Sequence, residues 1–156
     1  VESIKGYGIN QLYLADHKSL FPYRTMPHSS ILSGFLEKNR PEIVLIGATP
    51  VGRDLAPRIA SKLQCGLTAD CTSLEIGDHE DKKSGKTYQN LLYQIRPAFG
   101  GNIVATIINP ETRPQMATVR EGVMKMGKLK NAPKMEVASL NAEDYLQETD
   151  EAIKIV

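Results

Sequence analysis

The clearest pattern in the chain is an unbroken apolar run, Ile-Val-Leu-Ile, at residues 43–46. A strand with one wet face alternates apolar and polar residues, whereas a parallel strand covered on both faces is apolar throughout. The run therefore predicts a central parallel strand. A second run, at residues 103–108, obeys the same rule and predicts a second buried parallel strand.

A helix is predicted directly after the first run. Small residues and a proline end the strand pattern, and apolar side chains then recur at helical spacing at Leu55, Ile59 and Leu63. Pro57 lies inside this segment and removes one helical hydrogen bond, so we expect the helix to begin late, near Arg53, or to bend. Strand, small-residue turn and helix in this order form a ligand crevice in open parallel sheets, although a plain structural turn is the alternative.

Further elements complete an α/β pattern. We expect the tail of a helix within residues 1–8, a strand at 11–15 and a short helix that His28 opens and that ends near Asn39. An edge strand is expected near residues 135–140.

Residues 74–76 and 87–95 are rich in strand formers and flank the charged string GDHEDKKSG, which is typical of an antiparallel hairpin with a solvated tip. The fold class predicted from all these elements is a three-layer α/β sandwich. It has a mainly parallel open sheet, helices on both faces and a projecting antiparallel hairpin.

Composition argues against several classes of function. The chain has 19 basic and 18 acidic residues, which is too balanced to hold a nucleic-acid backbone, and no apolar window approaches the length needed for membrane insertion. The spacing of the two cysteines, Cys65 and Cys71, fits neither a zinc site nor a redox dithiol. We interpret them as reduced thiols, which fits either a cytosolic or a mitochondrial-matrix setting. Of these two, we expect the bacterial cytoplasm.

No catalytic or metal-binding constellation is visible in the sequence. The serines are scattered, the three histidines stand alone, and the acidic pair Glu80 and Asp81 falls in the predicted hairpin tip. The turn at Gly47 lacks the Lys-Ser/Thr ending of a phosphate-binding loop and the full glycine fingerprint of dinucleotide sites. We therefore predict no bond-making residue in this chain.

The most unusual local feature is the string RPAFGGN, which begins at Arg96 and lies between two predicted strands. Proline favours an extended conformation at Arg96, and the two glycines remove side-chain bulk nearby. A guanidinium fixed in this way suits a planar anion or the negative charge of a reduced flavin. The structural alternative is an ion pair between Arg96 and a carboxylate such as Asp70, with the glycines forming a simple turn.

Four strings, GATPVGRDLAPRIA, LTADCT, QIRPAFGGN and RPQMATVR, together resemble a known family. In this order they are similar to the amino-terminal domain of the alpha subunit of electron transfer flavoproteins. The resemblance extends from residue 6 to about residue 124, and it is specific because four separate motifs agree. It implies an electron carrier that takes electrons from acyl-CoA or related dehydrogenases, as in fatty acid β-oxidation, and passes them on through flavin adenine dinucleotide (FAD).

The resemblance also implies a partner and a set of cofactor contacts. In the family this domain packs against a beta subunit, and in electron-bifurcating members it approaches the ring of an FAD that the beta subunit binds. The contacts implied for this chain are Arg96, Ala98, Phe99, Gly100, Arg120 and Thr72. Asp70 is expected near the same crevice. Glu121 stands where the family often has proline, and it offers Arg120 a possible ion pair.

Compared with the family pattern, an opening strand and helix and the FAD-binding domain are absent from this sequence. We therefore expect a fragment, with residues 1–140 as a truncated domain of nucleotide-hydrolase-like α/β fold and residues 141–156 as a linker toward the FAD domain. Two rival interpretations are an independent adenine-nucleotide-binding or regulatory module, which would use the turn after Ala48, and an enzyme of the adenine-nucleotide hydrolase-like fold.

The fragment interpretation predicts that the purified chain is colourless, because FAD would be held only in the intact heterodimer. Absorption spectroscopy of the purified chain checks this expectation. A stoichiometric yellow flavin spectrum would contradict it.

Overall fold

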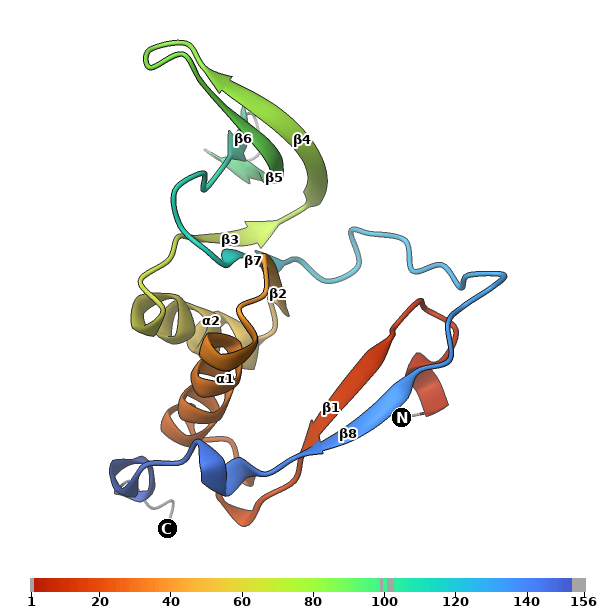
Figure 1. Cartoon of the computed structure of the whole chain (residues 1–156), viewed down its shortest axis with the longest axis vertical. Coiled ribbons are helices and arrows are strands. Elements are labelled where there is room, and N and C mark those ends of the chain that lie inside the picture. Colours follow the sequence, from red (N-terminus) through yellow and green to blue (C-terminus); the bar gives the residue numbers. More distant parts are fainter. Residues whose placement is uncertain (1, 99, 101–102, 153–156) are drawn as a thin grey trace. The chain divides into compact units, whose positions relative to one another are not determined.

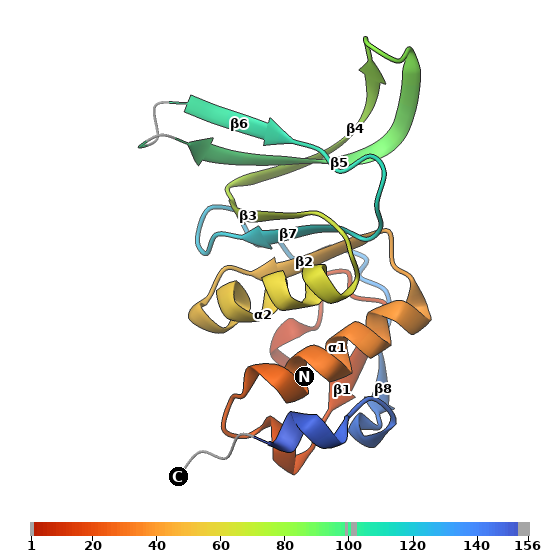
Figure 2. The same cartoon turned by 90° about the vertical axis from the view of Figure 1, so that its left-hand side faces the viewer.

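The computed structural model describes residues 2–98, 100 and 103–152 (Figures 1 and 2). The chain divides into two units. The larger unit comprises residues 32–124, and the smaller unit combines residues 1–31 with residues 125–156.

A three-stranded parallel sheet forms the centre of the larger unit. It consists of β2 (Ile43–Gly47), β7 (Gln115–Val119) and β3 (Leu67–Cys71), in the order β2-β7-β3. The middle strand, β7, is buried at its first four residues. The predicted central strand at residues 43–46 is confirmed as parallel, and its neighbour is β7.

Each face of this sheet is covered by a different layer, as Figure 2 shows. On one face, Leu55 and Ile59 of α2 (Pro50–Lys62) form a buried cluster with Met116 of β7. On the other face, Leu92 packs against Ala117 of the parallel sheet. The predicted three-layer α/β class is confirmed, and the second covering layer is an antiparallel sheet.

That antiparallel sheet consists of β4 (Ser73–Asp81), β5 (Lys86–Ala98) and β6 (Ile103–Ile107), in the order β4-β5-β6. Strands β4 and β5 confirm the predicted hairpin and are longer than expected.

The expectation of a second buried parallel strand at residues 103–108 is wrong. Strand β6 runs antiparallel to β5, and Ile103 and Val104 are 54% and 64% exposed. Residues 99–102 are too few for the crossover that parallel strands require, whereas a short connection allows antiparallel pairing. The second buried parallel strand is β7, which lies in the basic stretch that follows.

The two α-helices begin earlier than the sequence predicts. Helix α1 runs from Thr25 to Asn39, so His28 lies within it and does not open it. Helix α2 begins at Pro50 and not near Arg53, because the Thr49 hydroxyl accepts the Gly52 N–H at 3.0 Å and caps the helix. Proline is well tolerated at the first helical position because its missing N–H would have no partner there.

The smaller unit contains a two-stranded parallel sheet. Strands β1 (Gln11–Ala15) and β8 (Glu136–Leu140) pair in register, which confirms both predicted strands. Four short 3-10 helices accompany them: η1 (Glu2–Ile4), η2 (Lys18–Leu20), η4 (Ala142–Asp144) and η5 (Glu148–Glu151). Where a helix tail was expected, the described residues form the single turn η1.

A buried carboxylate ties the acidic end of the chain to α1 within the smaller unit. Asp150 is 2% exposed and accepts hydrogen bonds from the Ser30 hydroxyl at 3.0 Å and the Gln147 N–H at 2.9 Å. In the described part of the chain, no helix combines the length and the hydropathy that spanning a bilayer demands.

Replacing Gly52 by alanine tests how tightly α2 approaches the sheet. A Cβ atom there would lie 1.9 Å from the Gly47 carbonyl oxygen, so the helix or the strand end must move. We expect Gly52→Ala to lower the free energy of unfolding by about 1–3 kcal/mol, the usual effect of overpacking. Urea denaturation followed by circular dichroism measures this change.

Gly127→Ala is the matched control, because a Cβ atom at residue 127 would meet nothing within 4 Å. Equal stability of the two variants would show that the close approach of α2 does not constrain the fold.

Candidate functional site

The carboxyl ends of the three parallel strands meet at one edge of the sheet. The Ala48 N–H donates to the Val119 carbonyl at 2.8 Å, and the Arg120 N–H donates to the Cys71 carbonyl at 2.9 Å. These two main-chain bonds extend the ladder by one residue past β2 and past β7. The residues that follow these two strands are therefore held beside the ends of β7 and β3.

Asp70 reaches this edge through an irregularity in β3. The pairing register of β3 with β7 shifts between Thr68 and Cys71, and Asp70 adopts a positive φ of 65°. Aspartate is one of the few non-glycine residues that tolerate this conformation. The Asp70 N–H leaves the strand ladder and donates to the buried Thr118 hydroxyl at 2.8 Å. The bulge thereby redirects the Asp70 side chain, a common effect of β-bulges.

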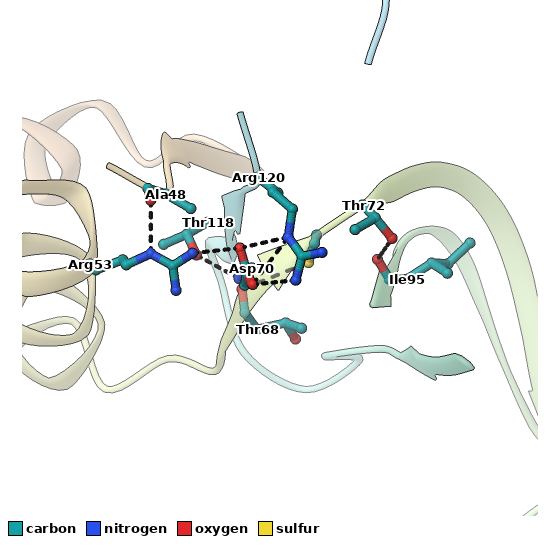
Figure 3. A network of polar contacts seen from close by, with 9 residues as sticks. Ala48, Arg53, Thr68, Asp70, Thr72, Ile95, Thr118 and Arg120 are labelled. Atoms are coloured by element: carbon teal, nitrogen blue, oxygen red, sulfur yellow. Dashed lines mark hydrogen bonds and ion pairs between the residues drawn. The ribbon is translucent and has the colours of Figure 1, made fainter. Parts of the chain in front are cut away.

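The Asp70 carboxylate binds two guanidinium groups (Figure 3). Arg120 approaches it through Nη2 at 2.6 Å and through Nε at 3.2 Å from each oxygen. Arg53, from the first turn of α2, donates from Nη2 to Asp70 Oδ1 at 2.8 Å and from Nε to the Ala48 carbonyl at 2.8 Å. We call Asp70, Arg53 and Arg120 the rim cluster. It carries one net positive charge, since two cations share one carboxylate.

Hydrogen bonding from Arg120 lowers the pKa of Asp70 below its ordinary value. The positive charges of Arg120 and Arg53 lower it as well, whereas partial burial of the carboxylate raises it. The same bond to Asp70 raises the pKa of Arg120. The carboxylate side chain is 14% exposed, whereas those of Arg53 and Arg120 are 53% and 42% exposed. The anion of the rim cluster is thus covered, and its cations face solvent.

Arg96 lies on the face of β5 that points toward the parallel sheet. Alternate residues of a strand share a face, so Arg96 shares one with Leu92, which packs against Cys71 and Ala117. Burial raises the pKa of the Cys71 thiol, and the charge of Arg96 opposes that shift, which places the two side chains within electrostatic reach. Arg96 is half-buried.

The alternative pairing of Arg96 with Asp70 is not found, because Arg53 and Arg120 occupy that carboxylate. Among the described residues, no hydrogen bond or ion pair engages the Arg96 guanidinium. The Arg96 guanidinium therefore differs from those of Arg53 and Arg120, which both bind the Asp70 carboxylate.

The structure connects Thr72 to both Arg120 and Arg96. Thr72 follows Cys71, whose carbonyl accepts the Arg120 N–H, and its own N–H donates to the Ile95 carbonyl at 2.8 Å. Ile95 directly precedes Arg96. Three of the predicted contact residues thus gather where the two sheets of the larger unit meet.

Of the other predicted contact residues, Ala98 ends β5, and Gly100, beyond the strand, is exposed with a φ of 71°. Phe99 lies outside the described residues. Glu121, which was considered as a partner of Arg120, does not fill that role, since Arg120 binds Asp70.

Sequence reasoning missed two members of this arrangement, Arg53 and Thr118. A signal exists for each. The helix dipole disfavours an arginine in the first turn of a helix. An arginine at such a position is therefore a signal to look for a nearby carboxylate. The hydroxyl of a threonine inside a buried strand needs a hydrogen-bond partner. The Thr118 hydroxyl finds one by accepting the Asp70 N–H.

The comparisons with known proteins agree with one another. The family described as "Electron transfer flavoprotein domain" matches residues 1–145 of this chain. The alpha subunit of electron transfer flavoprotein from Thermoanaerobacterium thermosaccharolyticum is 49% identical over 119 residues, which cover 76% of this chain and 33% of that protein. The alpha subunit from Megasphaera elsdenii is 38% identical over 158 residues, which cover 99% of this chain and 44% of that protein.

A relative with a different name is subunit LctC of the lactate dehydrogenase (NAD(+),ferredoxin) of Acetobacterium woodii. It is 42% identical over 137 residues, which cover 88% of this chain and 30% of that protein. The matched part of the chain thus covers between 30% and 44% of the length of these three relatives. None of these matches supports an independent adenine-nucleotide module.

Replacing Asp70 by asparagine tests the rim cluster through pH. The pKa of Asp70 in the folded chain lies below the unfolded value of about 3.9. The ionised carboxylate therefore stabilises the folded chain fully above about pH 3.9, and this stabilisation is lost as the pH falls through the folded-state pKa. We expect Asp70→Asn to be less stable than the wild type at pH 7, with the difference shrinking in acid. Urea denaturation of both proteins between pH 7 and pH 2 measures this difference in the free energy of unfolding.

Glu75→Gln removes one negative charge from an exposed position of β4 and serves as the control. A stability difference for Asp70→Asn that stays constant down to pH 2, or that Glu75→Gln reproduces, would contradict the assignment.

Proposed function

We propose that this chain, which belongs to the electron transfer flavoprotein family, is the scaffold and flavin-approach part of an alpha subunit in a heterodimeric electron carrier. The observation that supports this proposal best is the partly buried Arg96 beside a rim cluster whose two arginines are already paired. The arrangement provides charge and orientation. It contains no nucleophile paired with a base.

The proposed assembly includes FAD and a beta subunit. Electrons would come from dehydrogenases, with acyl-CoA dehydrogenases of β-oxidation as one candidate class, and would leave through the flavin. The relatives named as alpha subunits support a carrier role, whereas LctC is named as a subunit of a dehydrogenase. The carrier would work in the bacterial cytoplasm.

Arg96 would act on the flavin through its charge. A reduced flavin carries negative charge near N1 of its ring, and a guanidinium cannot lose its proton to escape that field. A fixed cation next to the ring therefore stabilises the reduced form more than the oxidised form. Arg96 fits this role because no described carboxylate neutralises it. Ala98, Phe99 and Gly100 would shape the surface that meets the ring.

The rim cluster would have a different part in the same contact. The charge of Arg120 is shared with Asp70, so Arg120 would influence a nearby flavin less than Arg96 does. Thr72 and the Asp70 bridge would instead keep the strand ends in place, so that Arg96 faces the partner in one orientation.

Replacing Arg96 by alanine in the intact heterodimer tests this proposal. We expect the flavin that this domain faces to become harder to reduce, with a lower midpoint potential, because the cation that favours the reduced form is gone. A tenfold loss of that preference corresponds to about 30 mV for a two-electron couple. Spectroelectrochemical titration measures the potential.

Two further variants sharpen the result. Arg96→Lys keeps the charge and should recover part of the shift, whereas Lys38→Ala removes an exposed charge from the end of α1 and should leave the potential unchanged. An unchanged potential in Arg96→Ala, or an equal shift in Lys38→Ala, would reject the role of Arg96.

A further inference from the structure

A second feature lies at the opposite edge of the parallel sheet, where its strands begin. The carboxyl-terminal ends of α1 and α2 and the start of β7 surround a cavity of about 370 Å³. This size falls within the range of small-molecule pockets, about 300–1,000 Å³. The cavity belongs to the larger unit and includes no residue of the rim cluster.

The floor of the cavity is apolar and firmly packed. Leu36 of α1 and Leu63 at the end of α2 line it, and both pack against the buried cluster that contains Ile59 and Met116. The floor is therefore the outer side of the hydrophobic core, which keeps its shape without a ligand. Such a surface accepts the apolar part of a small molecule.

The charged lining is predominantly basic. Arg40, Lys62 and Arg113 line the cavity together with one acid, Glu37. The lining itself carries two net positive charges, and the charge of Arg113 is shared with Glu42 outside the lining. Helix dipoles favour cations at helix ends, which accounts for Arg40 and Lys62. Arg113 lies in the loop before β7, where a helix dipole does not account for a cation.

Arg113 is held rigidly by its surroundings. Its Nε donates to Glu42 at 2.8 Å, and its Nη1 lies 3.0 Å from the Thr112 carbonyl and 3.3 Å from those of Asn109 and Pro110. Within the described part of the chain, no hydrogen bond uses Nη2. A guanidinium fixed on one side and open on the other is prepared to bind an oxyanion.

Two residues of the lining adopt strained backbone conformations. Arg40 and Gln64 have positive φ values of 46° and 52°, at helix ends where glycine is usual. A side chain at such a position costs free energy that glycine would not. Strain of this kind clusters at ligand sites, where the side chain has a use. Here both strained residues face the same cavity.

We propose that this cavity binds a small organic anion, whose oxyanion meets Arg113, Arg40 and Lys62 and whose apolar body lies on Leu36 and Leu63. Carboxylates and phosphate monoesters share this chemistry. The inference goes beyond the proposed electron-transfer role and does not depend on it, since none of the predicted flavin contacts that the structure describes (Thr72, Arg120 and those within residues 96–100) lines the cavity.

Nuclear magnetic resonance titration of the 156-residue chain with four probes tests the proposal. Hexanoate and hexyl phosphate combine an oxyanion with an apolar chain and should cause saturable shifts of the Leu36 and Leu63 resonances. Hexan-1-ol lacks the charge and inorganic phosphate lacks the chain, so each should bind at least about tenfold more weakly. The better of the two anionic probes identifies the preferred head group.

Paired variants locate the site. Arg40→Gln combined with Lys62→Gln should weaken binding of the better anionic probe by about tenfold, whereas Lys38→Gln, on the exposed end of α1 outside the cavity, should change it less than about twofold. The absence of saturable shifts with both anions, equal binding of hexan-1-ol, or equal weakening by Lys38→Gln would overturn the proposal.

Discussion

The carboxylate of Asp70 is the contact on which the carboxyl edge of the parallel sheet depends. It joins β3 to Arg120 after β7 and to Arg53 in the first turn of α2, so one side chain connects three elements. Opposite charges hold this contact at partly exposed positions, where such a pair alone adds little stability. The main effect of this contact is to hold the local geometry. The bulge in β3, the hydrogen bond to Thr118 and the two arginines together keep the Asp70 side chain in one orientation.

This arrangement separates two kinds of cation at the same edge. Arg53 and Arg120 are neutralised in part by the carboxylate they share, whereas Arg96 approaches from the antiparallel sheet without a described partner. In the proposed role, the two kinds of cation would act differently. The paired cations keep the surface in shape, and the unpaired one supplies an electrostatic field that is not cancelled locally.

The sequence predicted the fold class and most elements, because apolar runs and helical spacing report burial directly. It misplaced the second parallel strand, since the run at residues 103–107 and the run in β7 are both rich in strand formers and only loop length distinguishes their pairing. Arg96 was singled out from its local motif, whereas Thr72 and Arg120 were implied only by the family resemblance. Arg53 escaped notice because its pairing depends on the positive φ at Asp70, which redirects that carboxylate.

Strand β7 links the two ends of the sheet, and its length sets how far one end influences the other. Arg113 lies two residues before the strand and Arg120 directly follows it, and the five strand residues alone place roughly 17 Å between the basic cavity and the carboxyl edge. That distance is about twice the screening length of physiological salt, about 8 Å. An ion bound at the amino end would thus change the electrostatic potential at the carboxyl end very little, and the two surfaces can evolve independently.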